Sequence, residues 1–268
     1  MKKLLTALAA VFLILLGTGC TVLWPQDTPE ESGTPQQPQS AQAEPELNVK
    51  QKAADYAEML ESLDYEIMQN RDTVGWLKIP GTDINNSVLQ SYDNAYYLRR
   101  DERRRDEVYG CYFADYECST GEREDFAANT VIYGHSDMKD NPDGRRFSQL
   151  FKFLDPSFAE MTPCIQFCTA QAAMEWQVFA VFYTDVSFDY IQVNLDGDES
   201  VALADAAKKK SIYDYGVQVE PGDRILTLST CTVHFSDSSH RFVVMAKLLG
   251  EDEETPVQAF FTEHPENR

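Results

Sequence analysis

Basic residues are few in this sequence: 23 Lys and Arg residues stand against 44 Asp and Glu, which gives a formal net charge of −21 over 268 residues. So few basic groups exclude broad binding to nucleic acid, because such binding requires a surface that neutralises phosphates. The six cysteines contain no Cys-x-x-Cys pair, so no zinc site is expected, and no internal repeat occurs. What remains, at 43% hydrophobic and 25% charged residues, is the composition of a globular protein.

Residues 1–24 begin with a basic dipeptide, Lys2-Lys3, and then carry no charge over the 21 positions 4–24. Two interpretations remain open. A stretch of this length spans a hydrocarbon core of about 30 Å as an uncleaved anchor, with the lysines on the cytoplasmic side. Alternatively, the Gly-Thr-Gly-Cys string at 17–20 resembles a lipoprotein cleavage site, after which Cys20 carries the lipid. Both predict a folded part that is tethered at the extracellular face of the cell membrane.

Three segments follow this N-terminal region. Residues 25–46 contain five prolines among Gln, Ser and Glu, which cannot form a core and therefore predict an extended stalk. Residues 47–250 are the predicted folded domain, and within them residues 47–70 show apolar side chains at helical spacing, which predicts a leading helix. Residues 251–268 are predicted to be an acidic tail outside the domain.

The remainder of the domain shows short strand patterns separated by Gly, Pro, Asn and Asp. Eight such strands at irregular spacing indicate a closed or nearly closed β structure. Helical patterns interrupt them at residues 145–153 and 199–210. The predicted strands cover residues 74–79, 84–89, 110–115, 130–133, 164–169, 175–184, 224–231 and 241–249.

Three reactive or charged side chains lie at the ends of these strands. Cys231 ends one strand, Arg241 begins the next, and His135 follows a strand much earlier in the chain. Catalytic groups are commonly presented at such strand ends, and these three residue types could supply a nucleophile, a proton carrier and a charge stabiliser for acyl transfer. Each residue alone is more often structural, and His234 and His240 compete with His135 as the proton carrier.

The strings around these residues resemble the signature of the sortases, the membrane-anchored cysteine transpeptidases of Gram-positive bacteria. The carrying motifs are Thr-Leu-Ser-Thr-Cys at 227–231, Arg241 ten residues later, and Tyr-Gly-His at 133–135. Gly-Trp-Leu-Lys-Ile-Pro-Gly-Thr at 75–82 resembles the family's first-strand motif, and the similarity continues in order from residue 73 to residue 249. A helix before the first strand and a long helix-bearing connection at 185–223 resemble class B members.

The resemblance implies a mainly β fold: an eight-stranded sortase-type β-barrel with an N-terminal helix and a helix in the long connection between strands 6 and 7. It implies that His135, Cys231 and Arg241 are catalytic. Two departures from class B leave substrate detail open, namely Thr232 after the cysteine and a lengthened loop at 141–145. The substrate-binding residues implied by motif position are Asn94, Leu98, Tyr133, Tyr190, Ile191 and Ser229.

The chemistry implied by the resemblance is transpeptidation without a metal or organic cofactor. The substrate would be a surface protein with a C-terminal sorting motif, Leu-Pro-x-Thr-Gly or Asn-Pro-x-Thr-Asn, which Cys231 attacks after the threonine to form a thioester. The acceptor would be an amine of a peptidoglycan cross-bridge or its precursor. Alternatives are a pilin-polymerising sortase, a hydrolytic cysteine peptidase and, of a different class, a non-catalytic surface lipoprotein.

Four further cysteines, at positions 111, 118, 164 and 168, permit three complete disulfide pairings. On one strand, Cys164 and Cys168 would be about 13 Å apart, which is too far to bridge. A bond between Cys111 and Cys118 requires a turn between them, and free thiols are the alternative.

Five arginines at 99–105 alternate with acids and predict a solvated helix face with neighbouring ion pairs. The alternative is contact with an anionic wall polymer.

Overall fold

The computed structural model describes residues 43–137, 139–236 and 238–268. The predicted anchor at 1–24 and most of the predicted stalk at 25–46 lie outside the described residues. Within the part of the chain that is described, no helix is both long enough and apolar enough to span a membrane.

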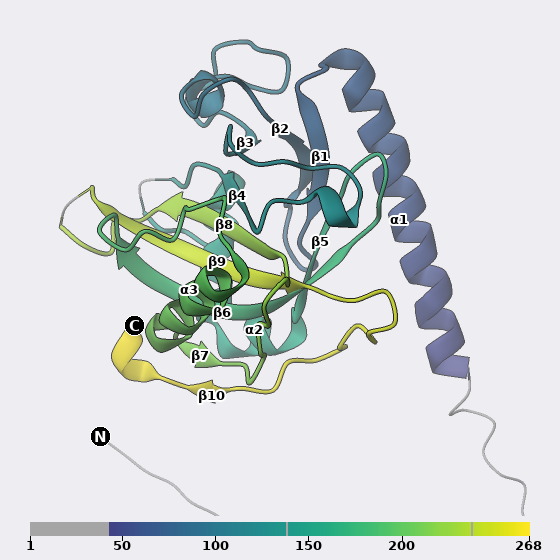
Figure 1. The fold of residues 1–268 in the computed structure, drawn as a ribbon. Helices are drawn as coiled ribbons and strands as arrows, with labels where there is room; N and C mark the ends of the chain where they lie inside the picture. Colours follow the sequence, from purple (N-terminus) through teal and green to yellow (C-terminus); the bar gives the residue numbers. More distant parts are fainter. Residues whose placement is uncertain (1–42, 138, 237) are drawn as a thin grey trace, which may run out of the picture. The chain divides into compact units, whose positions relative to one another are not determined.

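The centre of the fold is a closed barrel of eight strands in the order β1-β2-β3-β4-β8-β9-β6-β5 (Figure 1). The predicted mainly β fold with eight strands is thereby confirmed, and each strand lies within two residues of its predicted bounds. Most neighbours are antiparallel, but β2 pairs with β3, and β4 with β8, in parallel. The strands are β1 (Thr73–Lys78), β2 (Asn85–Leu89), β3 (Tyr112–Ala114), β4 (Asn129–Tyr133), β5 (Cys164–Cys168), β6 (Glu175–Asp185), β8 (Ile225–Cys231) and β9 (His240–Leu248).

The barrel interior is filled by aliphatic and aromatic side chains from all of its strands. Strand β1 alternates buried and half-buried positions, as expected where only one face meets the core. Gly75 on this strand faces β5 so closely that a Cβ atom would lie 2.4 Å from the Phe167 ring and 2.8 Å from the Cys168 carbonyl oxygen. The Gly in the first-strand motif therefore has a packing reason. Core side chains with no more than 1% exposure include Leu77, Ile132, Trp176, Leu228 and Phe242.

Two long helices cover the barrel. The leading helix α1 (Ala43–Gln69) lies beside β1 and buries Met59 and Leu63 (Figure 1). Helix α3 (Gly197–Lys210) lies in the connection between β6 and β8 and packs its apolar face on β6. Its start is fixed by a capping box between Asp196 and Glu199. The 3-10 helices are η1 (Tyr96–Arg99), η2 (Arg123–Asp125), η3 (Arg146–Leu154) and η4 (Pro265–Asn267), and the short α2 spans Pro156–Met161.

The segment 251–268 packs on the domain, although its acidic composition favours a free tail. Strand β10 (Thr262–Glu263) pairs antiparallel with β7 (Tyr213–Asp214), and the Phe261 ring lies 4.4 Å from the Tyr213 ring. Ala259 is buried, and its N–H donates to the Glu160 carbonyl at 2.7 Å. The few apolar residues among the acids therefore decide where this segment lies.

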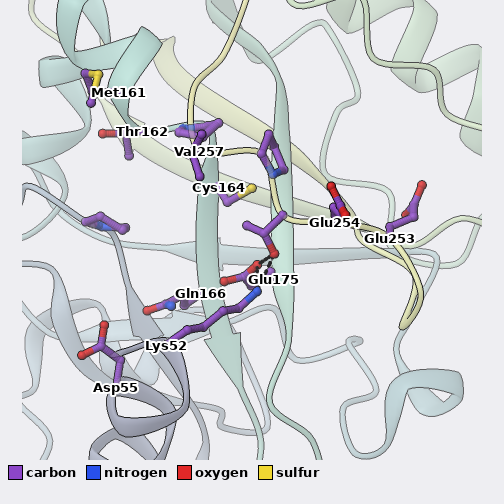
Figure 2. A pocket seen from close by; sticks show the side chains of 14 residues that line it. Lys52, Asp55, Met161, Thr162, Cys164, Gln166, Glu175, Glu253, Glu254 and Val257 are labelled. Carbon is purple, nitrogen blue, oxygen red and sulfur yellow. Dashed lines mark hydrogen bonds and ion pairs between the residues drawn. The ribbon is translucent and has the colours of Figure 1, made fainter. Parts of the chain in front are cut away.

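Helix α1 and the C-terminal segment meet at Glu175, at the start of β6 (Figure 2). Lys52 Nζ lies 2.6 Å from Glu175 Oε2, and the Thr255 hydroxyl donates to the same oxygen. These contacts border a pocket of about 670 Å³ whose lining also includes Asp55 and Gln166. The polar contacts join both chain flanks to the barrel wall.

Among the cysteines that the structure describes, the four outside the strand-end site are buried free thiols, so the pairing of Cys111 with Cys118 is not formed. Burial raises the pKa of Cys168 to about 11 and those of Cys118 and Cys164 to about 12. These thiols stay protonated at neutral pH and act as small core side chains.

Candidate functional site

Strand pairing brings the three predicted catalytic residues together at one end of the barrel. In the parallel β4–β8 pair, Tyr133 is in register with Ser229, so the chain that leaves β4 passes Thr230 and Cys231. In the antiparallel β8–β9 pair, Cys231 is in register with Arg241. His135, Cys231 and Arg241 line one pocket of about 210 Å³.

The chain leaves β4 through a crowded position, Gly134. A Cβ atom there would lie 2.7 Å from the Phe147 ring and 2.9 Å from the Tyr112 ring. The Gly134 N–H donates to the Ser229 carbonyl at 3.2 Å, and its carbonyl accepts from the Thr230 hydroxyl at 2.8 Å. Only glycine fits between these rings, and the two hydrogen bonds hold the next residue, His135, beside β8.

His135 is held by two backbone groups. Its Nε2 lies 2.8 Å from the Leu98 carbonyl oxygen, and its own carbonyl accepts from the Phe147 N–H at 2.9 Å. A carbonyl oxygen only accepts, so Nε2 carries a proton, and in the neutral ring Nδ1 is the basic atom. Burial lowers the pKa of His135 below its ordinary value, while the Leu98 hydrogen bond opposes this and Arg99 adds to it. The lowered pKa favours the neutral form of the imidazole.

Cys231 is the exposed last residue of an otherwise buried strand. Its carbonyl accepts from the Ser136 hydroxyl at 2.6 Å. The chain after it is fixed by Asp140, which accepts from the Thr232 hydroxyl at 2.5 Å and from the Val233 N–H at 3.0 Å. Thr232, a departure from the class B pattern, thus ties the lengthened loop after His135 to the backbone beside the thiol.

Arg241 lies at the start of β9, directly across from the thiol. Its Nη1 donates to the carbonyls of Ser238 and His240, at 2.8 Å each. These bonds fix the position of a permanently charged guanidinium at the pocket wall. The site therefore combines a cysteine, a histidine and an arginine, which can supply the nucleophile, the proton carrier and the charge stabiliser required for acyl transfer.

Four of the six predicted substrate-binding residues line the same pocket, namely Asn94, Leu98, Tyr133 and Ser229. Tyr190 is buried behind the wall, where its hydroxyl and the Ser229 hydroxyl share a hydrogen bond of 2.8 Å. Ile191 is 40% exposed and is not a lining residue. Four residues of the predicted set therefore lie at the pocket wall and Tyr190 lies behind it, whereas Ile191 is not brought to the pocket.

Sequence reasoning missed Asp115, which fixes two pocket residues at once. Its Oδ2 accepts from Asn94 Nδ2 at 2.7 Å and from the Tyr133 hydroxyl at 2.8 Å. Phe113, which also lines the pocket, was missed as well. Both positions fall on or next to β3, where an apolar run followed by Asp carries no local signal of function.

The competing histidines lie outside the pocket lining. The His234 ring stacks on Tyr183 with centroids 4.7 Å apart, and the His240 ring stacks on Phe235 at 4.0 Å. Among the described residues, no group of three or more His, Cys, Asp or Glu side chains is arranged to hold a metal ion.

The fold and the site together define a class: a β-barrel enzyme of the cysteine transpeptidase type. Comparison with known proteins specifies the family. The family model of the sortase domain matches residues 77–249. Sortase B of Staphylococcus aureus is 35% identical over 181 residues, which cover 67% of this chain and 71% of that protein. Sortase B of Listeria monocytogenes is 37% identical over 183 residues, with the same coverage of 67% and 71%.

Solved structures agree with the sequence comparisons. The structure described as a Staphylococcus aureus sortase B–substrate complex superimposes with a TM-score of 0.63 at 29% identity, covering 77% of this chain and all of that one. The chain therefore belongs to the sortase family and is most similar to class B sortases. Sortases are cysteine transpeptidases whose general role is to anchor proteins to the cell wall, and this chain is an enzyme of that kind.

Proposed function

We propose that this enzyme is tethered to the extracellular face of the membrane, cleaves a C-terminal sorting motif after its threonine, and transfers the protein to a cell-wall amine. The motif is of the Leu-Pro-x-Thr-Gly or Asn-Pro-x-Thr-Asn kind. The observation that carries this proposal is the single pocket lined by Cys231, His135 and Arg241.

In the acylation step, His135 Nδ1 takes the proton of the Cys231 thiol, and the thiolate attacks the threonine carbonyl carbon. The carbonyl oxygen becomes an oxyanion, to which the Arg241 guanidinium donates hydrogen bonds. When the C–N bond breaks, Nδ1–H returns the proton to the leaving amine, and a thioester remains on Cys231. Throughout, Nε2–H stays on the Leu98 carbonyl, a role that the 2.8 Å contact supports.

In the deacylation step, the acceptor amine attacks the thioester carbonyl and gives a proton to Nδ1. Collapse of the tetrahedral intermediate forms the new amide and expels the Cys231 thiolate, which regains the proton from the imidazole. One amide is thus exchanged for another without a net redox change or a cofactor. The substrate groove is assigned to Asn94, Leu98, Tyr133 and Ser229, with Tyr190 supporting Ser229 from behind, while the role of Ile191 in binding stays a prediction.

Peptides that carry each sorting motif, incubated with an added amine and analysed by mass spectrometry, test this function. We expect cleavage after threonine, an amide to the added amine, and complete loss of both products and of the thioester adduct with Cys231→Ala. Cleavage that survives in Cys231→Ala contradicts the mechanism. If only the hydrolysis product forms with every amine tested, the peptidase alternative is supported. If an amide forms only with the amine of a lysine side chain, the pilin-polymerising alternative is supported.

A further inference from the structure

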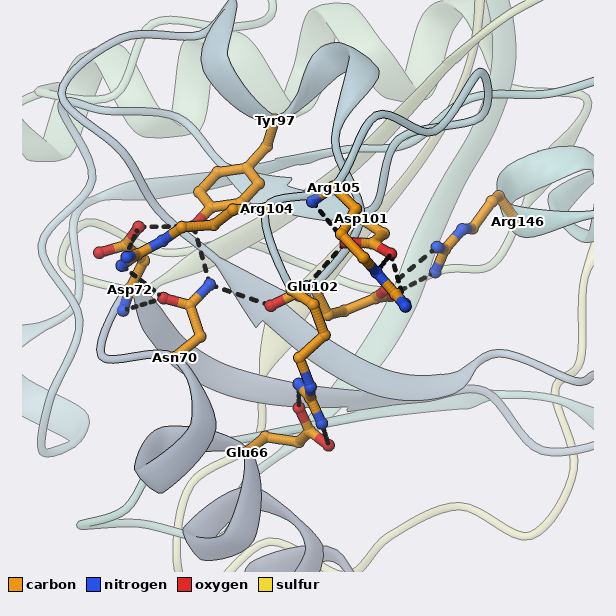
Figure 3. A network of polar contacts seen from close by, with 10 residues as sticks. Glu66, Asn70, Asp72, Tyr97, Asp101, Glu102, Arg104, Arg105 and Arg146 are labelled. Carbon is orange, nitrogen blue, oxygen red and sulfur yellow. Dashed lines mark hydrogen bonds and ion pairs between the residues drawn. The ribbon is translucent and has the colours of Figure 1, made fainter.

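A partly buried polar cluster lies next to η1, the helix that carries the Leu98 carbonyl (Figure 3). We call Asn70, Asp72, Tyr97 and Arg104 the Tyr97 cluster. The Tyr97 side chain is buried, and its hydroxyl donates to Asp72 Oδ2 at 2.5 Å and accepts from Asn70 Nδ2 at 2.9 Å. Burial, with the Asp72 hydrogen bond as a further cause, raises the pKa of Tyr97 to about 12, so the hydroxyl remains a donor.

Arg104 closes the cluster from the solvent side. Its Nη2 donates to Asn70 Oδ1 at 2.7 Å and lies 3.0 Å from Asp72 Oδ2. Asn70 and Asp72 lie in the turn between α1 and β1, so these contacts attach η1 and the loop after it to the barrel. Packing alone does not require such a cluster, since a phenylalanine would fill the space of the Tyr97 ring.

The cluster lies one residue before the carbonyl group that contacts the proposed proton carrier, His135. Tyr97 and Leu98 are adjacent in η1, and the Leu98 carbonyl is the group that meets His135 Nε2 at 2.8 Å. Fixing the Tyr97 side chain therefore fixes the direction of the Leu98 carbonyl. If η1 moved, the Leu98 carbonyl would turn away and the hydrogen bond to the His135 ring would be lost.

A second contact reaches His135 from the other side. Asn70 Nδ2 also donates to the Glu102 carbonyl at 3.0 Å, and the Glu102 carboxylate pairs with Arg146 Nη1 at 2.6 Å (Figure 3). Arg146 precedes Phe147, whose N–H donates to the His135 carbonyl at 2.9 Å. The same cluster thus bears on the side chain of His135 through η1 and on its backbone through η3.

We propose that the Tyr97 cluster is a positioning device for His135, which holds the Leu98 carbonyl at Nε2 and so reserves Nδ1 for proton exchange with Cys231 and the amines. This inference rests on the proposed function. Tyr97 is a positioning residue and touches no reacting atom. The charged or titratable groups around the imidazole are Arg99 on η1, with Cys231 and Arg241 in the shared pocket.

The test compares Tyr97→Phe with Tyr215→Phe. Both changes remove one hydroxyl from a buried ring, but the Tyr215 hydroxyl has no hydrogen-bond partner in the described part of the chain. We expect Tyr97→Phe to lower kcat for sorting-peptide cleavage about tenfold, because part of the acid–base contribution is lost when the imidazole is misdirected. KM should stay within about twofold of the wild-type value, and Tyr215→Phe should leave both constants unchanged.

The decisive readout is the ¹⁵N NMR spectrum of the His135 ring over a pH titration. In the wild type we expect the Nε2–H tautomer, and in Tyr97→Phe a mixture of tautomers with a lower pKa, because the Leu98 hydrogen bond opposes the lowering by burial. Unchanged ring shifts in Tyr97→Phe overturn the proposal, whether kcat falls or not. If Tyr97→Phe does not fold, Arg104→Gln at the cluster's exposed edge is measured by the same criteria.

This design separates the inference from the proposed function. The ring spectrum reports the tautomer of His135 without any substrate. A wild-type enzyme that fails to cleave sorting peptides but shows the expected tautomer change refutes the proposed function and leaves the positioning role standing. If the wild-type enzyme cleaves sorting peptides normally but its His135 Nε2 carries no proton, the positioning role is refuted and the proposed function stands.

Discussion

The carboxylate of Asp115 offers a quantitative test of the pocket. Asp115→Asn preserves volume but replaces one carboxylate oxygen by an NH₂ group, which donates and does not accept. At the Oδ2 position, this group cannot accept from Asn94 Nδ2, although the Tyr133 hydroxyl can turn to accept from it. In the wild type, the Glu117 N–H donates to Asp115 Oδ1 at 3.0 Å, and an NH₂ group placed at the Oδ1 position could not accept this bond. One hydrogen bond to a charged group is lost in either orientation.

Such a bond contributes about 1.5–3 kcal/mol. If the loss appears in transition-state binding through Asn94, kcat/KM for a fluorescence-quenched sorting peptide falls about 10- to 150-fold, since about 1.4 kcal/mol corresponds to a factor of ten. Asp214→Asn is the matched control, because that exposed carboxylate accepts from the Gly216 N–H on the β7 segment. A lower melting temperature with kcat/KM within threefold of wild type would refute a role for Asp115 in the pocket and leave it a purely structural residue.

Two further predictions concern pH and the C-terminal segment. Because burial lowers the pKa of His135 from its ordinary 6.5, the acid limb of kcat/KM should lie below pH 6.5. The unfolded chain binds this proton more tightly, so His135 contributes stability that is present above pH 6.5 and lost as pH falls; urea titrations of His135→Gln should lack this loss. Phe261→Ala should cost about 1–3 kcal/mol in urea unfolding, by loss of its packing on Tyr213, with kcat unchanged; the cost is below that of a fully buried phenylalanine because Phe261 is only partly buried. An acid limb above pH 6.5 would contradict the prediction for His135. A fall in kcat would contradict the prediction for Phe261→Ala.

Local patterns were sufficient to predict the barrel strands and to place three candidate residues at strand ends, but the catalytic roles of those residues were implied only by the resemblance to the family strings. Each strand is a short apolar run with its own turn signals, and Cys231 and His135 lie within or directly after such runs. What patterns could not supply is the register that places Cys231 opposite Arg241, since that depends on pairing across the sheet. The family strings supplied this information indirectly.

Elements that depend on distant contacts were predicted less well. Residues 145–153 have an apolar spacing that suits a helix, but the segment forms a 3-10 helix, η3, whose first residues are tied to the loop after His135 and to Glu102. Strand β10 lies in an acidic segment, where two apolar residues outweigh the charge pattern. Asp115 acts through Asn94, 21 positions away in sequence, and Tyr133, 18 positions away.

The arginine-rich stretch shows the same limit most clearly. Ion pairs were expected with neighbouring acids on a helix face, but the stretch after η1 is a loop, and its partners come from elsewhere. Arg103 pairs with Glu66 on α1, and Arg104 with Asp72, while Arg105 alone keeps a neighbour, Asp101. These pairs are partly or largely exposed, so each contributes little to stability by itself. The contacts of Arg103 and Arg104 nevertheless join the loop after η1 to α1 and to the turn before β1, next to the helix whose Leu98 carbonyl meets His135.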